Sequence, residues 1–273
     1  MIKLIKKVLL LMMTGAFPFT ATPQEKPFEA GEELNYVIRY KYGPVMLKAG
    51  TAKFSVRDVC YNRNPALEAV ITVKTSSFFD GIYKMRDTLQ SYINTHFEPI
   101  YHIRRLHESK SRYDEEMFYH AYGEHYSEVR VIRSNGSDVR FDKVLNCNNQ
   151  GLDMLSVLIF ARTLNYRKMD KGQTIRITNF FGKKKINIFA RFMGEEEVES
   201  ADADKYQAYK LNLDVSDKTF EKSKNAMEIW ISADSNRLPL KLKAQLKIGA
   251  AEAQLVSYGN LKHSLNSKKI LKL

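Results

Sequence analysis

The sequence predicts a mainly β protein, in which a single large antiparallel sheet curls into an open or incomplete barrel with one buried or lid helix at about residues 152–165. The first observation is an alternation from Leu238 to Ile248, where every second residue is apolar and most residues between are lysines. Such a period of two gives a strand one apolar and one polar face. The second is a series of about a dozen short strand-like segments at nearly regular spacing, which favours an antiparallel sandwich or barrel. The third is a single long segment with helical spacing.

The N-terminus is expected to be a secretory signal peptide over residues 1–22. Three lysines precede a short apolar run from Val8 to Ala16, and Pro18 ends it. That run is shorter than the roughly 20 residues that a membrane-spanning helix needs. An uncleaved N-terminal anchor is the alternative. We therefore expect a Sec-exported protein in the periplasm or cell envelope of a Gram-negative bacterium, with one β-rich domain over 28–262 and a loose basic tail over 263–273.

The formal net charge of +12 falls by three when the signal lysines are removed. A basic surface attracts nucleic acid, anionic lipid headgroups or acidic glycans. An exported protein rarely meets nucleic acid, so we expect no nucleic-acid partner and allow peripheral contact with an anionic membrane surface. The simplest interpretation is that the lysines solvate the outer faces of strands.

The expected strands follow one another almost without a break. A first strand alternates from Leu34 to Tyr42, and Asn135-Gly136 later marks a tight hairpin turn. The chain ends in an amphipathic pair of strands around Trp230, which Asp234-Ser235-Asn236 joins. The expected strand segments are 34–42, 46–59, 67–74, 83–93, 100–106, 117–122, 129–133, 139–144, 174–181, 185–193, 207–215, 225–248 and 253–258.

Residues 152–164 are the expected helix, with Asp153 as its N-cap and Ser156 bonded to the backbone. The helix is too apolar for full exposure, so it should be buried against the sheet. An inward Arg162 then needs a buried carboxylate, and Asp87 and Asp234 are the candidates. Residues 76–81 are expected to form a second, shorter helical turn, and 194–205 an exposed acidic loop or hairpin end.

Residues that could carry catalysis or bind a metal form no recognised pattern. The six histidines lack metal-ligand spacing, so no metal and no cofactor is expected. No G-x-S-x-G turn surrounds Ser156, and the acidic runs 114–116 and 195–197 are typical of solvated loops rather than of a paired-carboxylate site. Cys60 and Cys147 lie in expected loops, and export permits either a disulfide between them or two free thiols.

The order of motifs resembles an exported bacterial domain-of-unknown-function family, numbered three-one-zero-eight, over about Gly31 to Tyr258. The most specific element is W-x-S-x-D-x-x-R-x-P, from Trp230 to Pro239. The resemblance implies a shape similar to the LolA and LolB lipoprotein carriers, an open barrel whose concave apolar face is covered by a helix. It also implies that Arg237 pairs with a carboxylate and that Pro239 begins a strand.

Three functions follow from these expectations. The leading one is a non-enzymatic binding or carrier module for a lipid or other apolar envelope ligand. The alternatives are an envelope protein-interaction scaffold and an uncharacterised hydrolase. The candidate groove residues are Tyr36, Tyr40, Leu158, Phe181 and Trp230, and the candidate structural polar residues are Asp87, Asp153, Arg162, Asp234 and Arg237.

Overall fold

The computed structural model describes residues 26–109, 111–121, 127–148, 151–201, 203–215, 226–246 and 249–269. The expected signal peptide, the last residues of the tail and the end of the 225–248 segment lie outside these ranges. No helix in the described part of the chain is long and apolar enough to cross a membrane.

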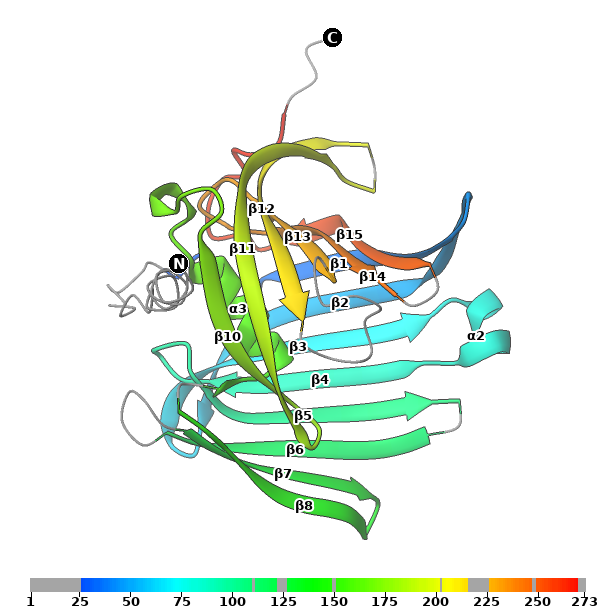
Figure 1. Ribbon diagram of the computed structural model, residues 1–273, viewed down its shortest axis with the longest axis vertical. Coiled ribbons are helices and arrows are strands. Elements are labelled where there is room, and N and C mark those ends of the chain that lie inside the picture. The colour runs from blue at the N-terminus through cyan, green and yellow to red at the C-terminus, as the bar shows by residue number, and fades with distance from the viewer. Residues whose placement is uncertain are drawn as a thin grey trace, which may run out of the picture.

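Fifteen strands of the described chain form one sheet in the order β8-β7-β6-β5-β4-β3-β2-β1-β15-β14-β13-β12-β11-β10-β9. Neighbours pair antiparallel, apart from the short parallel contact between β9 and β10. The predicted single curled sheet is therefore confirmed, and Figure 1 shows its two halves facing each other. The strands are β1 (Glu33–Tyr42), β2 (Val45–Tyr61), β3 (Asn64–Thr75), β4 (Arg86–Ile93), β5 (Pro99–Glu108), β6 (Ser111–Ala121), β7 (Ser127–Asn135), β8 (Asp138–Cys147), β9 (Gly151–Leu152), β10 (Thr174–Phe181), β11 (Lys184–Glu199), β12 (Lys205–Val215), β13 (Met227–Ser232), β14 (Pro239–Gln245) and β15 (Ala250–Gly259).

Helix α3 (Met154–Thr163) lies inside the curl, against β3, β4, β9 and β10 (Figure 1). Its first turn contacts Ser91 of β4, so the side of the sheet that carries Ser91 is the inner face. Paired residues share a face. Following the register from Ser91 through Ala69 to Val56, and along β2 to Gly50, places Ile38 on the inner face. Following the register from β1 to β15 and from β15 to β14 in the same way shows which residues of those strands lie on the inner face.

The two ends of the sheet overlap rather than pair. Phe180 of β10 packs into a cluster with Met117, Val129 and Val131 on the inner face of β6 and β7. At Gly151 a Cβ would lie 1.8 Å from the Phe180 ring, so no larger residue fits there. Side-chain contacts close the seam further: the Arg104 guanidinium lies 4.4 Å from the Phe181 ring centroid. The barrel is nearly closed because its edges stack, which also covers backbone groups that an exposed edge would leave free.

The barrel is packed more tightly where α3 lies than at its other end. Leu34, Phe54, Leu155 and Ile159 are at most 1% exposed. The other end carries the β1–β2 hairpin and helix α2 (Ser77–Tyr83), which sit on the same side in Figure 1. Helix α2 confirms the short helix predicted at residues 76–81. A single 3-10 turn, η1 (Tyr166–Lys168), follows α3.

Three local expectations need correction. Residues 195–197, predicted as part of an acidic loop, belong to β11 and pair with β12. Glu115, predicted on a solvated loop, is fully buried on β6, where Arg104 and Arg133 contact its carboxylate. The start of the predicted loose tail is docked, because Ser267 is buried and its backbone N–H donates to Asp234 Oδ2 (3.2 Å). In each case the contact comes from a residue of another strand or turn, 10 to 33 positions away in the sequence.

Candidate functional site

The inner face carries a buried polar cluster centred on Asp153. Ser91 Oγ donates to Asp153 Oδ1 (2.8 Å) and lies 2.7 Å from His102 Nδ1. The Asp153 carboxylate also accepts the backbone N–H groups of Leu155 (2.8 Å) and Ser156 (3.0 Å), and the Ser156 hydroxyl (2.6 Å). The predicted N-cap is therefore present, whereas Ser156 donates to the capping carboxylate instead of the backbone. The cluster fastens the first turn of α3 to β4 and β5.

This cluster contains a serine, a histidine and an aspartate, but not in the order that a hydrolytic triad needs. In a triad the acid contacts one ring nitrogen of the histidine and the nucleophilic serine contacts the other. Here Asp153 Oδ1 (3.3 Å) and Ser91 Oγ both approach Nδ1 of His102. The side chains of Ser91, His102, Asp153 and Ser156 are each at most 1% exposed. Since Ser91 donates to Asp153, its oxygen accepts from a neutral His102 with its proton on Nδ1.

Protonation of His102 should destabilise the fold. Burial lowers its pKa below the ordinary 6.5, despite the opposing charge of Asp153. A base with a lower pKa in the folded state contributes full stability above its unfolded pKa and loses it as the pH falls. We expect the free energy of unfolding to fall between about pH 7 and pH 5, with a shallower slope in His102→Gln. Urea titrations at each pH measure this; equal slopes for the two proteins would contradict it.

Arg162 forms the second buried cluster, but with a partner that the sequence did not indicate. Its Nη1 and Nη2 atoms donate to Glu32 Oε1 (2.5 Å) and Oε2 (2.8 Å), in a two-pronged ion pair. The guanidinium also donates to the backbone carbonyls of Asn236 (2.9 Å) and Arg237 (3.1 Å). Neither predicted partner contacts it: Asp87 accepts the backbone N–H of His107 (3.0 Å), and Asp234 lies in a separate network.

The W-x-S-x-D-x-x-R-x-P element is a structural junction. Asp234 Oδ1 accepts from Ser232 Oγ (2.9 Å) and Asn236 N (3.0 Å), and its Oδ2 accepts from Ser267. Arg237, at a positive φ of 51°, donates to the carbonyl of Leu164 at the end of α3 (2.9 Å). The expected carboxylate partner of Arg237 is replaced by this helix cap and by the rings of Tyr166 and Tyr209, each with its centroid 5.2 Å away. Pro239 begins β14 as expected.

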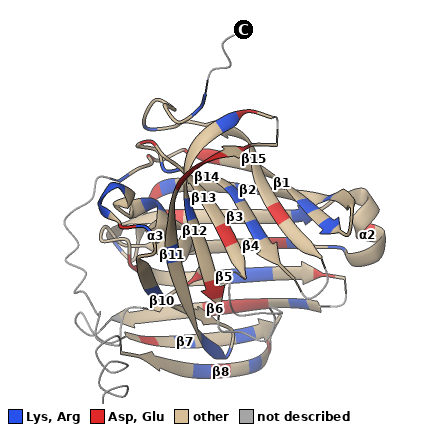
Figure 2. Cartoon of the chain, turned by 45° about the horizontal axis from the view of Figure 1, so that its top comes forward, with Lys and Arg blue, Asp and Glu red and all other residues tan. Residues whose placement is uncertain are grey.

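Trp230 lies on the outer face, opposite its neighbour Ile229. Its register partners Lys210 and Lys241 place their ammonium groups 4.8 and 5.6 Å from the indole centroid. The indole N–H donates to Glu196 (2.6 Å). The lysines predicted to face only water are thus neutralised across strands, as in the Lys210–Glu228 (3.1 Å) and Lys241–Glu252 (3.2 Å) pairs. Figure 2 shows this alternation of blue and red segments on β12–β14.

The other four candidate groove residues point to the inside of the curl. Tyr36 and Tyr40 lie on the inner face of β1, where the Tyr36 hydroxyl donates to the carbonyl of Pro239 (2.9 Å). Leu158 of α3 packs against the core cluster that surrounds Tyr36. Phe181 lies apart from them, at the tip of the β10–β11 hairpin beneath Arg104. The core cluster therefore includes Trp230 and has Tyr36 and Leu158 packed against it, whereas Phe181 lies outside it.

The two cysteines are not joined. Cys60 is exposed near the end of β2, and Cys147 is buried at the end of β8, so both are thiols. Among the described residues no group of three or more histidine, cysteine, aspartate or glutamate side chains could hold a metal ion. Two small hollows, of about 250 and 290 Å³, are lined largely by polar residues at the rim of β15 and at the seam beside Cys147. Neither touches α3.

These features define the class: a rolled antiparallel sheet, barrel-like, whose distinctive polar residues fasten one internal helix. The chain belongs to the family described as a protein of unknown function (DUF3108), whose model matches residues 35–256. The fold is similar to the crystal structure of a β-barrel-like protein of domain of unknown function DUF1849 from Brucella abortus. That likeness has a TM-score of 0.56 at 8% identity, and covers 86% of this chain and 100% of the other. No curated protein matches the sequence.

Proposed function

We propose that this protein is a non-enzymatic binding or carrier module of the cell envelope, with a lipid or another apolar molecule as its ligand. The observation that carries the proposal is the partial exposure of apolar side chains on the inner face. Ile38, Tyr40, Val73, Leu89 and Leu242 are half-buried, although the register places each on the side that faces α3. Apolar side chains that stay accessible on the concave side of a sheet are typical of a binding surface for an apolar ligand.

The location of these side chains supports uptake from one direction. Ile38, Tyr40 and Val73 lie toward the end of the sheet that carries α2, whereas Leu155 and Ile159 of α3 are buried in the core. A ligand entering from the α2 end would meet apolar surface first and the closed core afterwards. The expected signal peptide supports a place in the periplasm. In the Ser91–His102–Asp153 cluster, the serine and the aspartate both approach the same ring nitrogen of the histidine, and this arrangement supports binding without hydrolysis.

The test compares two tryptophan substitutions at adjacent positions of β3. Val73 is half-buried on the inner face and Thr72 is exposed on the outer face. We expect Val73→Trp to lower the affinity for a fluorescent fatty-acid probe by about tenfold, because the ring occupies the surface that the probe would cover; that corresponds to about 1.4 kcal/mol. Thr72→Trp serves as the matched control and should bind like the unchanged protein.

Thermal melting of both variants shows whether each still folds. Should Val73→Trp unfold, Ile38→Ser replaces it, since a hydroxymethyl group removes apolar contact without adding volume. Native mass spectrometry of the purified mature protein provides an independent readout of a retained lipid. Absence of probe uptake and of retained lipid in the unchanged protein, or equal affinity in the two tryptophan variants, would overturn the proposal.

A further inference from the structure

Helix α2 is turned the opposite way from an ordinary surface helix. None of its seven residues is buried. Phe78 and Ile82, one turn apart, are 66% and 69% exposed. Amphipathic helices on soluble proteins normally place such residues toward the core. Here the large apolar side chains point into solvent, which needs a reason.

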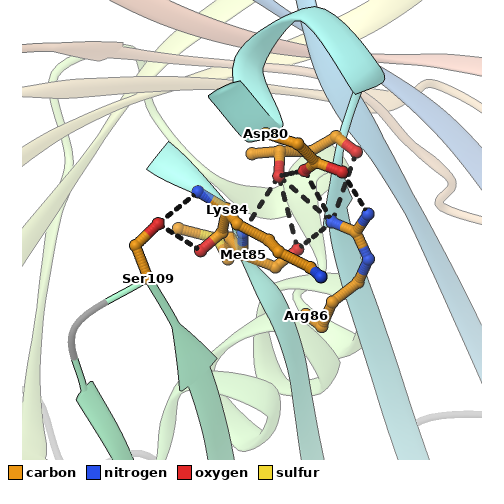
Figure 3. A network of polar contacts seen from close by, with 6 residues as sticks. Asp80, Lys84, Met85, Arg86 and Ser109 are labelled. Atoms are coloured by element: carbon orange, nitrogen blue, oxygen red, sulfur yellow. Dashed lines mark hydrogen bonds and ion pairs between the residues drawn. The ribbon is translucent and has the colours of Figure 1, made fainter. Parts of the chain in front are cut away.

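Polar contacts hold α2 in this orientation. Asp80 accepts from Thr75 Oγ1 (2.5 Å) and from both Nη atoms of Arg86 (2.9 and 2.5 Å). After the helix, the backbone N–H of Lys84 donates to Ser109 Oγ (2.6 Å). Figure 3 shows this network between the helix, the start of β4 and the β5 end. Because the polar side of α2 is bound to the sheet, the apolar side is presented outward.

The β1–β2 hairpin adds to the same exposed apolar surface. Ser76 ties the start of α2 to β2 through the carbonyls of Lys48 (3.0 Å) and Ala49 (2.8 Å). The large apolar residues at the hairpin tip are also exposed, by 41–63%. With those of α2 they form what we call the hairpin–α2 surface: Tyr42, Val45, Met46, Leu47, Phe78 and Ile82. These are concentrated at one end of the barrel (Figure 1).

Basic side chains surround this surface. Lys41, Lys48, Lys74 and Lys84 are exposed, and none of them forms an ion pair with another residue in the described ranges. The neighbouring carboxylate of Asp80 is already neutralised by Arg86. Figure 2 shows blue segments of the adjoining strands beside α2. An apolar surface bordered by free lysines is complementary to a bilayer that has anionic headgroups above an apolar interior.

We propose that the hairpin–α2 surface docks on an anionic phospholipid bilayer, with Phe78 and Ile82 inserted at the headgroup boundary and the surrounding lysines on the phosphates. The surface borders the end at which the inner face is accessible, but docking does not require the inner face to bind anything. Membrane contact and ligand uptake are therefore separable properties, and they are measured separately.

Co-flotation with vesicles of phosphatidylglycerol and phosphatidylcholine tests the docking. The mature protein should float with vesicles that contain phosphatidylglycerol, less with phosphatidylcholine alone, and less again as salt is raised. Phe78→Ser/Ile82→Ser should reduce binding by about tenfold or more, since two large apolar side chains lose their insertion. Val139→Ser/Val144→Ser, on exposed valines of β8, is the matched control and should float like the unchanged protein.

Fluorescent fatty-acid uptake from solution is measured on the same variants. We expect Phe78→Ser/Ile82→Ser to retain uptake, so loss of docking and loss of the proposed carrier function are told apart. Failure of the unchanged protein to float, or equal floating of the two double variants, would overturn the proposal. So would a concentration-dependent dimer that Phe78→Ser/Ile82→Ser abolishes in the absence of vesicle binding, because the surface would then hold a second copy of this chain.

Discussion

Replacing Glu32 with glutamine is expected to destabilise the protein by about 3–5 kcal/mol, because Arg162 would keep its charge in a fully buried position without a counter-charge. Both side chains are 0% exposed, and the carboxylate takes two hydrogen bonds from the guanidinium. The two backbone carbonyls that Arg162 also contacts cannot replace a full negative charge. Urea-induced unfolding gives the free energy directly.

The double variant Glu32→Leu/Arg162→Met separates the ion pair from the packing around it. It removes both charges at similar volume, so it should be less destabilised than the sum of the two single changes by more than about 1 kcal/mol. Asp142→Asn is the surface control, since its pair with Arg130 is half-exposed and solvent screening leaves it a small contribution to stability. A loss from Glu32→Gln as small as that of Asp142→Asn would contradict the prediction.

Replacing Asp153 with alanine should destabilise the protein by a similar amount, about 3–5 kcal/mol. The change removes the N-cap of α3, worth about 1–2 kcal/mol, and leaves the buried hydroxyls of Ser91 and Ser156 without their acceptor, at about 1–3 kcal/mol each before relaxation. These terms are not fully additive, because the groups share one carboxylate. The measurement is again urea unfolding, joined to amide hydrogen exchange.

Amide hydrogen exchange should show which part of the Asp153→Ala variant is destabilised. In Asp153→Ala the amides of α3 should lose protection before those of β1 and β2, since the cap ties only the helix to β4 and β5. Asp138→Ala, on the exposed start of β8, provides the control and should change neither quantity measurably. Uniform loss of protection across the sheet would show that Asp153 supports the whole barrel rather than the helix.

The two buried clusters and the turn from Ser232 to Pro239 account for the polar residues that the sequence motifs contain. Asp153, Arg162, Asp234 and Arg237 all lie around the two ends of α3 or in the turn that holds it. They position one helix inside a rolled sheet. The residues proposed to bind the ligand and the membrane are instead apolar and half-buried or exposed.

The sequence by itself determined the elements whose signal is local. The period-two alternation of β14, the turn at Asn135-Gly136 and the capped apolar helix from Asp153 each depend on residues a few positions apart. Those patterns were enough to predict one curled sheet with one internal helix. The N-cap was predictable for the same reason, since the cap and the amides it satisfies are two and three residues apart.

Only the tertiary structure decided which distant groups meet. Glu32 lies 130 residues from Arg162, and Ser267 lies 33 residues from Asp234. A buried charge such as that of Arg162 must be paired, but the sequence contains several carboxylates that could pair with it equally well. The face that Trp230 occupies was likewise fixed by the register with β12 and β14, because a shift of one residue would exchange the two faces of a strand. Periodicity states that a strand has two faces; the curl of the whole sheet decides which of them lies inside.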